Sequence, residues 1–240
     1  MRRWSLLRCV ALSLLITVIC ACNVGLSSDA PLPAVASRGA AAGDTEAGAQ
    51  PIAQPVLIVC LGDSLTAGLG LSEEQAFPAL VEQALRNQSL AVRVINAGVS
   101  GDTTAGGVRR VDWLLKQHPD ILVIGLGAND GLRGQPLDGI AENLRTIIGK
   151  AQAAGAKVLL LGMRIPTNYG TAYADGFRAI YPRLAKQMSV ALVPFLLEGV
   201  ALDPTLNQAD QIHPNAKGHK ILARTVLSQL APLVREHGHP

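Results

Sequence analysis

The sequence lacks the excess of basic residues that is typical of nucleic-acid-binding proteins. Its 21 Lys and Arg residues outnumber its 18 Asp and Glu residues by three. However, Arg2, Arg3 and Arg8 lie within the first 21 residues, where no acidic residue occurs, so the rest of the chain carries as many basic as acidic residues. A neutral chain offers no strong electrostatic attraction to a phosphate backbone, and we expect no nucleic-acid partner.

Cysteine is scarce outside the N-terminal segment. Three of the four cysteines, Cys9, Cys20 and Cys22, belong to the N-terminal segment. Cys60 is then alone in an apolar run, which excludes a disulfide framework and indicates a small buried apolar side chain.

Motifs for nucleotide cofactors and metals are missing as well. The glycines of Gly125-Leu126-Gly127 do not form a dinucleotide fingerprint, because Asp130 stands where the third glycine is required. No Walker-type Gly-Lys-Ser/Thr sequence occurs. Asp210 and His213 supply too few ligands for a metal site, even with His219. We therefore expect no cofactor and no metal.

The N-terminus has the features of an export signal. Two arginines precede an apolar run over Leu6–Ala21, and polar sequence follows soon afterwards. This pattern predicts a secretory signal peptide over residues 1–21, and the run is too short to predict a membrane-spanning helix. We expect the protein to be exported.

The end of this segment, Ile19-Cys20-Ala21-Cys22, resembles a bacterial lipobox. That resemblance implies that Cys22 becomes a lipidated N-terminus, although Cys20 is unusual at its position. The alternative is ordinary signal cleavage nearby, with Cys22 incidental. With lipidation, the protein is expected on the periplasmic side of the envelope, and Asn23 favours anchoring to the outer membrane.

Residues 22–54 are rich in Ala, Gly, Pro and Ser and show no apolar periodicity. This composition predicts a flexible tether. Residues 55–240 then form one domain without internal repeats, which we expect to be monomeric.

Strand and helix patterns alternate through this domain. Continuous apolar runs indicate strands that are buried on both faces, as in parallel sheets covered by helices. The predicted fold is an α/β three-layer αβα sandwich with a five-stranded parallel sheet, of the flavodoxin-like type. Strands are expected at Val56–Leu61, Val92–Ile95, Ile121–Leu126, Lys157–Leu161 and Val190–Pro194, and helices at Glu73–Asn87, Thr104–Gln117, Leu137–Ala154, Thr171–Met188 and Asn215–Val234.

Polar residues follow the first three strands or precede the last helix, and ligands of such sheets bind at the carboxyl ends of the strands. Ser64, in Gly62-Asp63-Ser64-Leu65, can present its hydroxyl and its N–H there. Asp210 and His213 lie three residues apart, so the carboxylate can orient the imidazole while its other nitrogen faces Ser64. Taken alone, Ser64 is equally a turn or helix-capping serine.

Two more loops offer hydrogen-bond donors. Gly101 lacks a Cβ, so its N–H can turn toward a ligand. Asn129 offers amide N–H groups suited to a developing oxyanion. The simpler alternatives are that Ser100 or Asp102 caps the next helix and that Asn129 is an ordinary turn residue.

Together these blocks resemble the SGNH or GDSL hydrolase family, over about Pro55 to Val234. The resemblance implies a catalytic triad of Ser64, His213 and Asp210, with an oxyanion hole formed by Ser64, Gly101 and Asn129.

Further matches resemble the bacterial acyl-CoA thioesterase I, arylesterase and lysophospholipase group. They are found in residues 100–103, 126–134 and 168–170. This implies an esterase and thioesterase acting on acyl chains of aryl esters, acyl thioesters or lysophospholipids. Gln211 departs from the group, where glycine is frequent, and the lipid anchor and long tether are not typical of its soluble periplasmic members. Two alternatives stay open, a carbohydrate acetylesterase of the same fold and a non-enzymatic envelope lipoprotein.

Four aromatic residues recur every four positions: Tyr169, Tyr173, Phe177 and Tyr181. We expect Phe177 and Tyr181 to pack against the sheet. Tyr169, in the loop beyond the fourth strand, is the predicted substrate contact.

Overall fold

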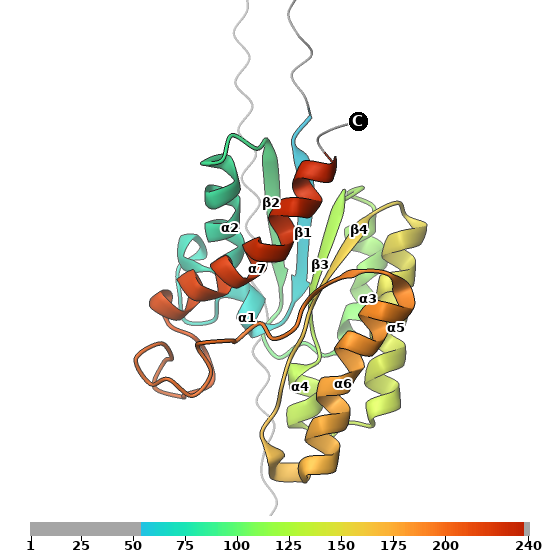
Figure 1. Cartoon of the computed structure of the whole chain (residues 1–240), viewed down its shortest axis with the longest axis vertical. Coiled ribbons are helices and arrows are strands. Elements are labelled where there is room, and N and C mark those ends of the chain that lie inside the picture. Colours follow the sequence, from blue (N-terminus) through green and yellow to red (C-terminus); the bar gives the residue numbers. More distant parts are fainter. Residues whose placement is uncertain (1–53, 238–240) are drawn as a thin grey trace, which may run out of the picture. The chain divides into compact units, whose positions relative to one another are not determined.

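A computed structural model of the protein describes residues 54–237. The predicted signal peptide, Cys22 and nearly all of the predicted tether lie outside the described residues. Figure 1 shows alternating strands and helices. None of the described helices combines the length and the apolar character needed to cross a bilayer.

The five strands form one parallel sheet in the order β2-β1-β3-β4-β5. Their bounds are β1 Val56–Gly62, β2 Val92–Gly98, β3 Ile121–Gly125, β4 Lys157–Leu161 and β5 Ala191–Val193. This arrangement confirms the predicted fold class.

Helices cover both faces of the sheet. Helices α2 and α7 pack together on one face, and α3, α5 and α6 pack in sequence on the other (Figure 1). Their bounds are α2 Phe77–Arg86, α3 Thr104–Leu115, α5 Leu137–Ala153, α6 Thr171–Met188 and α7 Ala216–His237.

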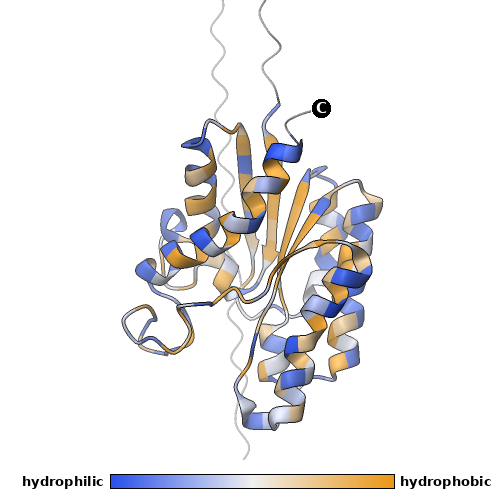
Figure 2. Ribbon diagram, in the orientation of Figure 1, coloured by the Kyte–Doolittle hydropathy of each residue, from blue (hydrophilic) through white to orange (hydrophobic). Residues whose placement is uncertain are grey.

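The core lies where these layers meet. All five residues of β3 are buried, and the strands are strongly apolar while the helices alternate between apolar and polar residues (Figure 2). Phe177 and Tyr181 are fully buried and pack edge to face, which confirms the packing predicted for them. Burial of each such large side chain contributes about 1.5–3 kcal/mol or more to folding.

Two short helices begin directly at the carboxyl edge of the sheet. Helix α1 (Ser64–Ala67) follows β1, and α4 (Ala128–Leu132) follows β3. Figure 1 shows both near the lower ends of the strands. The sequence patterns missed them, because four or five residues hold too little periodicity to indicate a helix.

The bounds of the longer elements were mostly predicted within a few residues. Strand β4 and helix α6 have the predicted bounds. The helix expected from Glu73 begins instead as a 3-10 turn, η1 (Glu73–Gln75), and α2 starts at Phe77 with Pro78 in its first turn. Proline is tolerated there because the first N–H groups of a helix have no intrahelical partner.

Candidate active site

Ser64 is the first residue of α1 and is separated from the end of β1 only by Asp63. The side chain of Asp63 caps this helix by accepting the N–H of Leu65 at 3.0 Å. Gly68 ends the helix in the left-handed conformation, with φ of 75°. The capping alternative considered for Ser64 is therefore wrong, because Asp63 is the cap and Ser64 is the first helical residue.

The Ser64 hydroxyl faces a histidine. Ser64 Oγ lies 2.9 Å from His213 Nε2, and His213 Nδ1 lies 2.6 Å from Asp210 Oδ2. Ser64 is buried and the His213 side chain is about one-fifth exposed. The structure thus joins Asp210, His213 and Ser64 in one hydrogen-bonded line.

The loop that carries His213 is held by its own hydrogen bonds. Asp210 Oδ1 accepts the backbone N–H groups of Ile212 at 2.9 Å and of His213 at 3.0 Å. Gln211, between Asp210 and Ile212, has φ of 60°, a left-handed conformation that favours glycine. This geometry gives a physical reason why glycine is frequent at the position in the resembling group.

These donors determine the charge of Asp210. The backbone N–H of His213, its imidazole and the N–H of Ile212 lower the pKa of Asp210 to about 2. The carboxylate therefore remains ionised at neutral pH and accepts a hydrogen bond from Nδ1.

Gly101 and Asn129 follow the carboxyl ends of β2 and β3, the two strands that pair with β1. Gly101 has φ of 80°, and a Cβ there would meet only Arg133 at 4.0 Å, so conformation rather than space favours glycine. Asn129 Nδ2 donates to the carbonyl oxygen of Asp102 at 2.9 Å and lies 3.5 Å from Asp63 Oδ2. We call Ser64, Gly101 and Asn129 the donor wall.

The donor wall holds N–H groups without strong partners. Within residues 54–237, neither the backbone N–H of Ser64 nor that of Gly101 donates to a protein acceptor. One proton of Asn129 Nδ2 has only the long approach to Asp63. Such groups could stabilise negative charge developing on a bound oxygen.

Asp102 does not cap helix α3, in contrast to the alternative considered for it. Thr103 is the cap, and its hydroxyl accepts the N–H of Gly106 at 3.2 Å. The Asp102 carboxylate instead pairs with Arg110 at 2.7 Å. Sequence reasoning missed Arg110. Its place one turn beyond the buried Gly106 on α3 is compatible with a side chain turned inward, but no sequence pattern indicates which groups it contacts.

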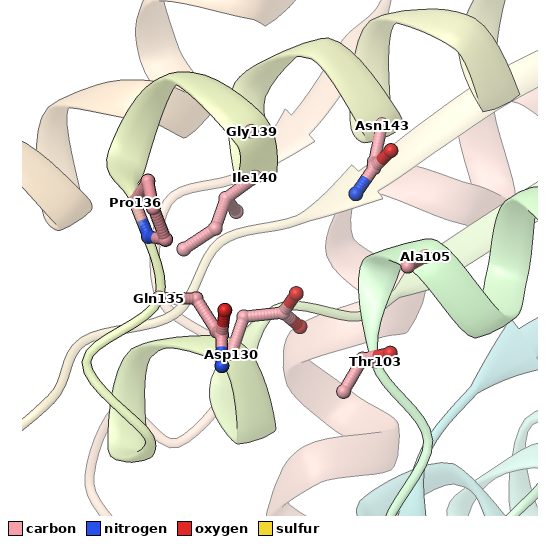
Figure 3. A pocket seen from close by; sticks show the side chains of 8 residues that line it. All are labelled: Thr103, Ala105, Asp130, Gln135, Pro136, Gly139, Ile140 and Asn143. Atoms are coloured by element: carbon pink, nitrogen blue, oxygen red, sulfur yellow. The ribbon is translucent and has the colours of Figure 1, made fainter.

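Helix α4, which carries Asn129, is fixed to α3 by a buried carboxylate. Asp130 accepts the backbone N–H of Thr104 at 2.9 Å and its hydroxyl at 2.7 Å, and Asn143 donates to the same hydroxyl at 3.0 Å. Figure 3 shows Asp130 and Asn143 beside a cavity of about 280 Å³. None of Ser64, Gly101, Asn129 or His213 lines this cavity, so it is separate from the triad.

Tyr169 lies in the 3-10 turn η2 (Thr167–Tyr169) and is half-exposed. Its hydroxyl donates weakly to the carbonyl oxygen of Leu132 at 3.4 Å, and its ring packs against Tyr173. The structure thus places it beside the end of α4. Its role as a substrate contact stays a prediction.

Cys60 and His219 are buried within the core. Burial raises the pKa of the Cys60 thiol to about 12, so this cysteine stays protonated and is a poor nucleophile. His219 Nδ1 accepts the N–H of Phe77 at 3.1 Å, and burial lowers the pKa of His219 to about 4. Among the described residues, no group of three or more His, Cys, Asp or Glu side chains is arranged to hold a metal.

Comparisons with known proteins agree with this geometry. Residues 60–221 match the GDSL-like lipase/acylhydrolase family. The chain is 45% identical over 186 residues to the esterase TesA of Pseudomonas aeruginosa, which covers 77% of this chain and 92% of that protein. It is 43% identical over 178 residues to the thioesterase 1/protease 1/lysophospholipase L1 of Escherichia coli, covering 74% and 84%.

A solved structure is also similar, that of the psychrotrophic esterase EstA from Pseudoalteromonas inhibited by monoethylphosphonate. It superposes with a TM-score of 0.72 at 33% identity, covering 75% of this chain and 99% of that one.

Proposed function

The chain belongs to the GDSL-like lipase/acylhydrolase family and is a hydrolase of carboxylic esters or thioesters, and we propose that it acts through a Ser64–His213–Asp210 triad and an acyl-enzyme. The observation that carries this proposal is the continuous line of hydrogen bonds from Ser64 Oγ through both ring nitrogens of His213 to Asp210. The similarity to esterases and thioesterases, and not the triad geometry, sets aside the alternative of a non-enzymatic protein.

The reaction begins when Ser64 Oγ attacks the acyl carbonyl carbon and its proton passes to His213 Nε2. The ionised Asp210 stabilises the imidazolium that forms. The carbonyl oxygen becomes an oxyanion, which the N–H groups of the donor wall stabilise. His213 then returns the proton to the departing alcohol or thiol, which leaves an ester between Ser64 and the acyl group.

Hydrolysis of the acyl-enzyme repeats these steps with water. His213 Nε2 takes a proton from the water as its oxygen attacks the acyl carbonyl. The donor wall again receives the oxyanion. Collapse of the intermediate returns the proton to Ser64 Oγ and releases the carboxylic acid.

Exposed apolar side chains occur in the segments that carry the proposed site and support an acyl chain as the group transferred. Leu69 follows α1, Val99 follows β2, Leu132 ends α4, Tyr169 follows β4, and Ile212 precedes His213; all five are large and at least 44% exposed. Contact between these side chains and a hydrocarbon chain is favourable by about 0.8 kcal/mol per buried methylene. We propose aryl esters, acyl thioesters and lysophospholipids as substrates, with Tyr169 contacting the acyl chain.

The location of the enzyme is a separate proposal. The signal and lipobox patterns support an enzyme that is exported and anchored through lipid on Cys22 to the periplasmic side of the outer membrane, and we propose that it is monomeric. Cys22→Ala should abolish incorporation of labelled fatty acid, whereas Cys60→Ala should not. Unchanged labelling of Cys22→Ala would disprove the anchor.

The triad is tested with the full chain and a panel of aryl esters of graded acyl length, acyl-CoAs and lysophospholipids. Ser64→Ala and His213→Ala should each lose on the order of 10⁶-fold in turnover. Ser228→Ala is the control, because the Ser228 hydroxyl bonds only within α7. Wild-type protein should react with a fluorophosphonate probe, and Ser64→Ala should not.

Two outcomes would change the proposal. Near-normal esterase activity in Ser64→Ala would overturn the triad. A strict preference for acetyl esters would instead indicate a carbohydrate acetylesterase.

A further inference from the structure

Arg110 donates hydrogen bonds to three separate segments near Ser64. Its Nε lies 2.7 Å from Asp102 Oδ2, its Nη1 2.5 Å from the carbonyl oxygen of Ala97, and its Nη2 2.8 Å from that of Gly62. Arg110 comes from the buried face of α3, and its side chain is only 22% exposed. One guanidinium therefore bonds the end of β1, the end of β2 and the loop before α3.

Two of these acceptors, Gly62 and Asp102, lie next to or close to residues of the donor wall in the sequence. Gly62 is the last residue of β1 and is separated from Ser64 only by Asp63. Asp102 directly follows Gly101, and its carbonyl oxygen accepts the side-chain N–H of Asn129 at 2.9 Å. Ser64, Gly101 and Asn129 come from three different segments: helix α1, the loop before α3 and helix α4. Arg110 is linked to these segments through its hydrogen bonds to Gly62 and Asp102.

We propose that Arg110 is a positioning residue that holds the three donors of the oxyanion hole at fixed distances from one another. This inference rests on the proposed function, because it assigns Arg110 a role in the same reaction. Arg110 does not contact the reacting atoms in this role, and it acts through Gly62 and Asp102.

Arginine suits this position for a chemical reason. Its planar guanidinium presents donors in fixed directions and keeps its charge at any working pH. The Asp102 side chain is only 10% exposed, so the ion pair is largely shielded from water. Loss of Arg110 would leave this carboxylate with only the backbone N–H of Thr103, 2.9 Å from Oδ1, as a partner. The carbonyl of Gly62 also accepts the N–H of Val99 at 3.0 Å, which adds a direct link between two of the loops.

Geometry of this kind matters more for turnover than for substrate binding. The donors must lie about 2.7–3.1 Å from the position of the oxyanion, which differs from that of the ground-state carbonyl oxygen. A shift of about 1 Å can cost on the order of 10²-fold in rate. Removing Arg110 should therefore reduce kcat and leave KM nearly unchanged.

The test uses the full chain with Arg110→Met, which keeps most of the length but removes all donors, and Arg110→Lys, which keeps the charge. For an aryl ester, Arg110→Met should lose about 10- to 100-fold in kcat with KM within about twofold of wild type. Arg110→Lys should lose less, because a lysine can retain the pair with Asp102. Arg109→Met is the matched control, because Arg109 is the exposed neighbour on the same helix.

Two further measurements separate positioning from a merely structural role. Binding of an alkylboronic acid, which forms a tetrahedral adduct with a reactive serine, should weaken in parallel with kcat. In an Asn129→Ala background, Arg110→Met should cost clearly less than in wild type, because part of the hole is already lost. Circular dichroism gives the folded fraction, to which every rate is normalised.

Several outcomes would overturn the inference. These are a normalised kcat for Arg110→Met within about twofold of wild type, unchanged boronate binding, or effects of Arg110→Met and Asn129→Ala that multiply in full. If Arg110→Met does not fold, Arg110→Lys takes its place. A wild-type kcat and wild-type boronate binding in Arg110→Lys would then overturn the inference. Failure of the proposed function differs from all of these, because Ser64→Ala would then remain active.

Discussion

Two carboxylates near Ser64 lie in opposite environments. Asp210 is about half exposed, and N–H donors from its own loop lower its pKa to about 2. Asp63 is buried; desolvation raises its pKa to about 6, and the negative charge of Asp102 adds to this, against the lowering effects of the Leu65 N–H and His213. The same chemical group is thus kept charged on one side of the nucleophile and is driven toward neutrality on the other.

This difference extends to the regions that carry the two residues. The His213 loop is exposed and is fixed largely by hydrogen bonds among neighbouring residues, 208–213. The donor wall is assembled from three segments that are far apart in the sequence, and the partly buried Arg110 and the buried Asp130 join them. The first region should respond to substitution mainly in its acid–base chemistry. The second should respond in geometry and in stability.

Among the substitutions that compare these two regions, the largest effect is expected from Asp210→Asn in the exposed loop. The amide can still accept the two backbone N–H groups, so the loop should keep its shape. It favours the wrong imidazole tautomer, however, and cannot stabilise the imidazolium, so kcat should fall on the order of 10⁴-fold. The measurement is kcat for an aryl ester, together with a melting curve.

Asp203→Asn is the control for this prediction. Asp203 is another exposed aspartate, and it accepts the N–H and the hydroxyl of Thr205 without contacting His213. Its substitution should leave kcat unchanged. A loss of less than about tenfold in Asp210→Asn would show that the loop does not orient the base in the way proposed.

A smaller loss is expected from Asn129→Ala in the donor wall. Removal of one oxyanion donor should lower kcat about 10²–10³-fold, with little change in melting temperature, because the amide makes one short hydrogen bond, to Asp102. Asn143→Ala is a matched control, since Asn143 bonds to Thr104 and lies outside the wall. Equal losses in the two variants would contradict a specific role for Asn129.

The sequence alone predicted most of the fold because buried parallel strands are continuous apolar runs. Strand β4 shows this well, with the expected bounds and four of its five residues buried. The residues of the proposed triad could also be selected from sequence, since Asp210 and His213 are neighbours in one loop. Arg110 could not, because its three acceptors are brought together only by the tertiary fold. Asp63 was part of a quoted motif, yet its burial and raised pKa depend on the packing of α4 and the loop before α3.

The smallest effect concerns stability rather than rate and compares the two carboxylates directly. Asp63 has a pKa of about 6 in the folded protein against 3.8 as its ordinary value. The folded state therefore holds the proton more tightly, so this residue favours folding below about pH 4 and loses that contribution as the pH rises through 6. Asp63→Asn should consequently gain up to about 3 kcal/mol relative to wild type between pH 4 and pH 7. Chemical denaturation at several pH values measures this difference.

Asp210→Asn serves as the internal control in the same experiment, because the pKa of Asp210 is lowered from 3.8 to about 2. Its stabilising contribution is fully present above pH 4 and is lost only as the pH falls through 2. The stability of Asp210→Asn relative to wild type should therefore stay constant from pH 4 to pH 7, while that of Asp63→Asn rises. If the relative stability of both variants stays constant with pH, Asp63 is not desolvated. The contrast between the His213 loop and the donor wall would then rest on geometry alone.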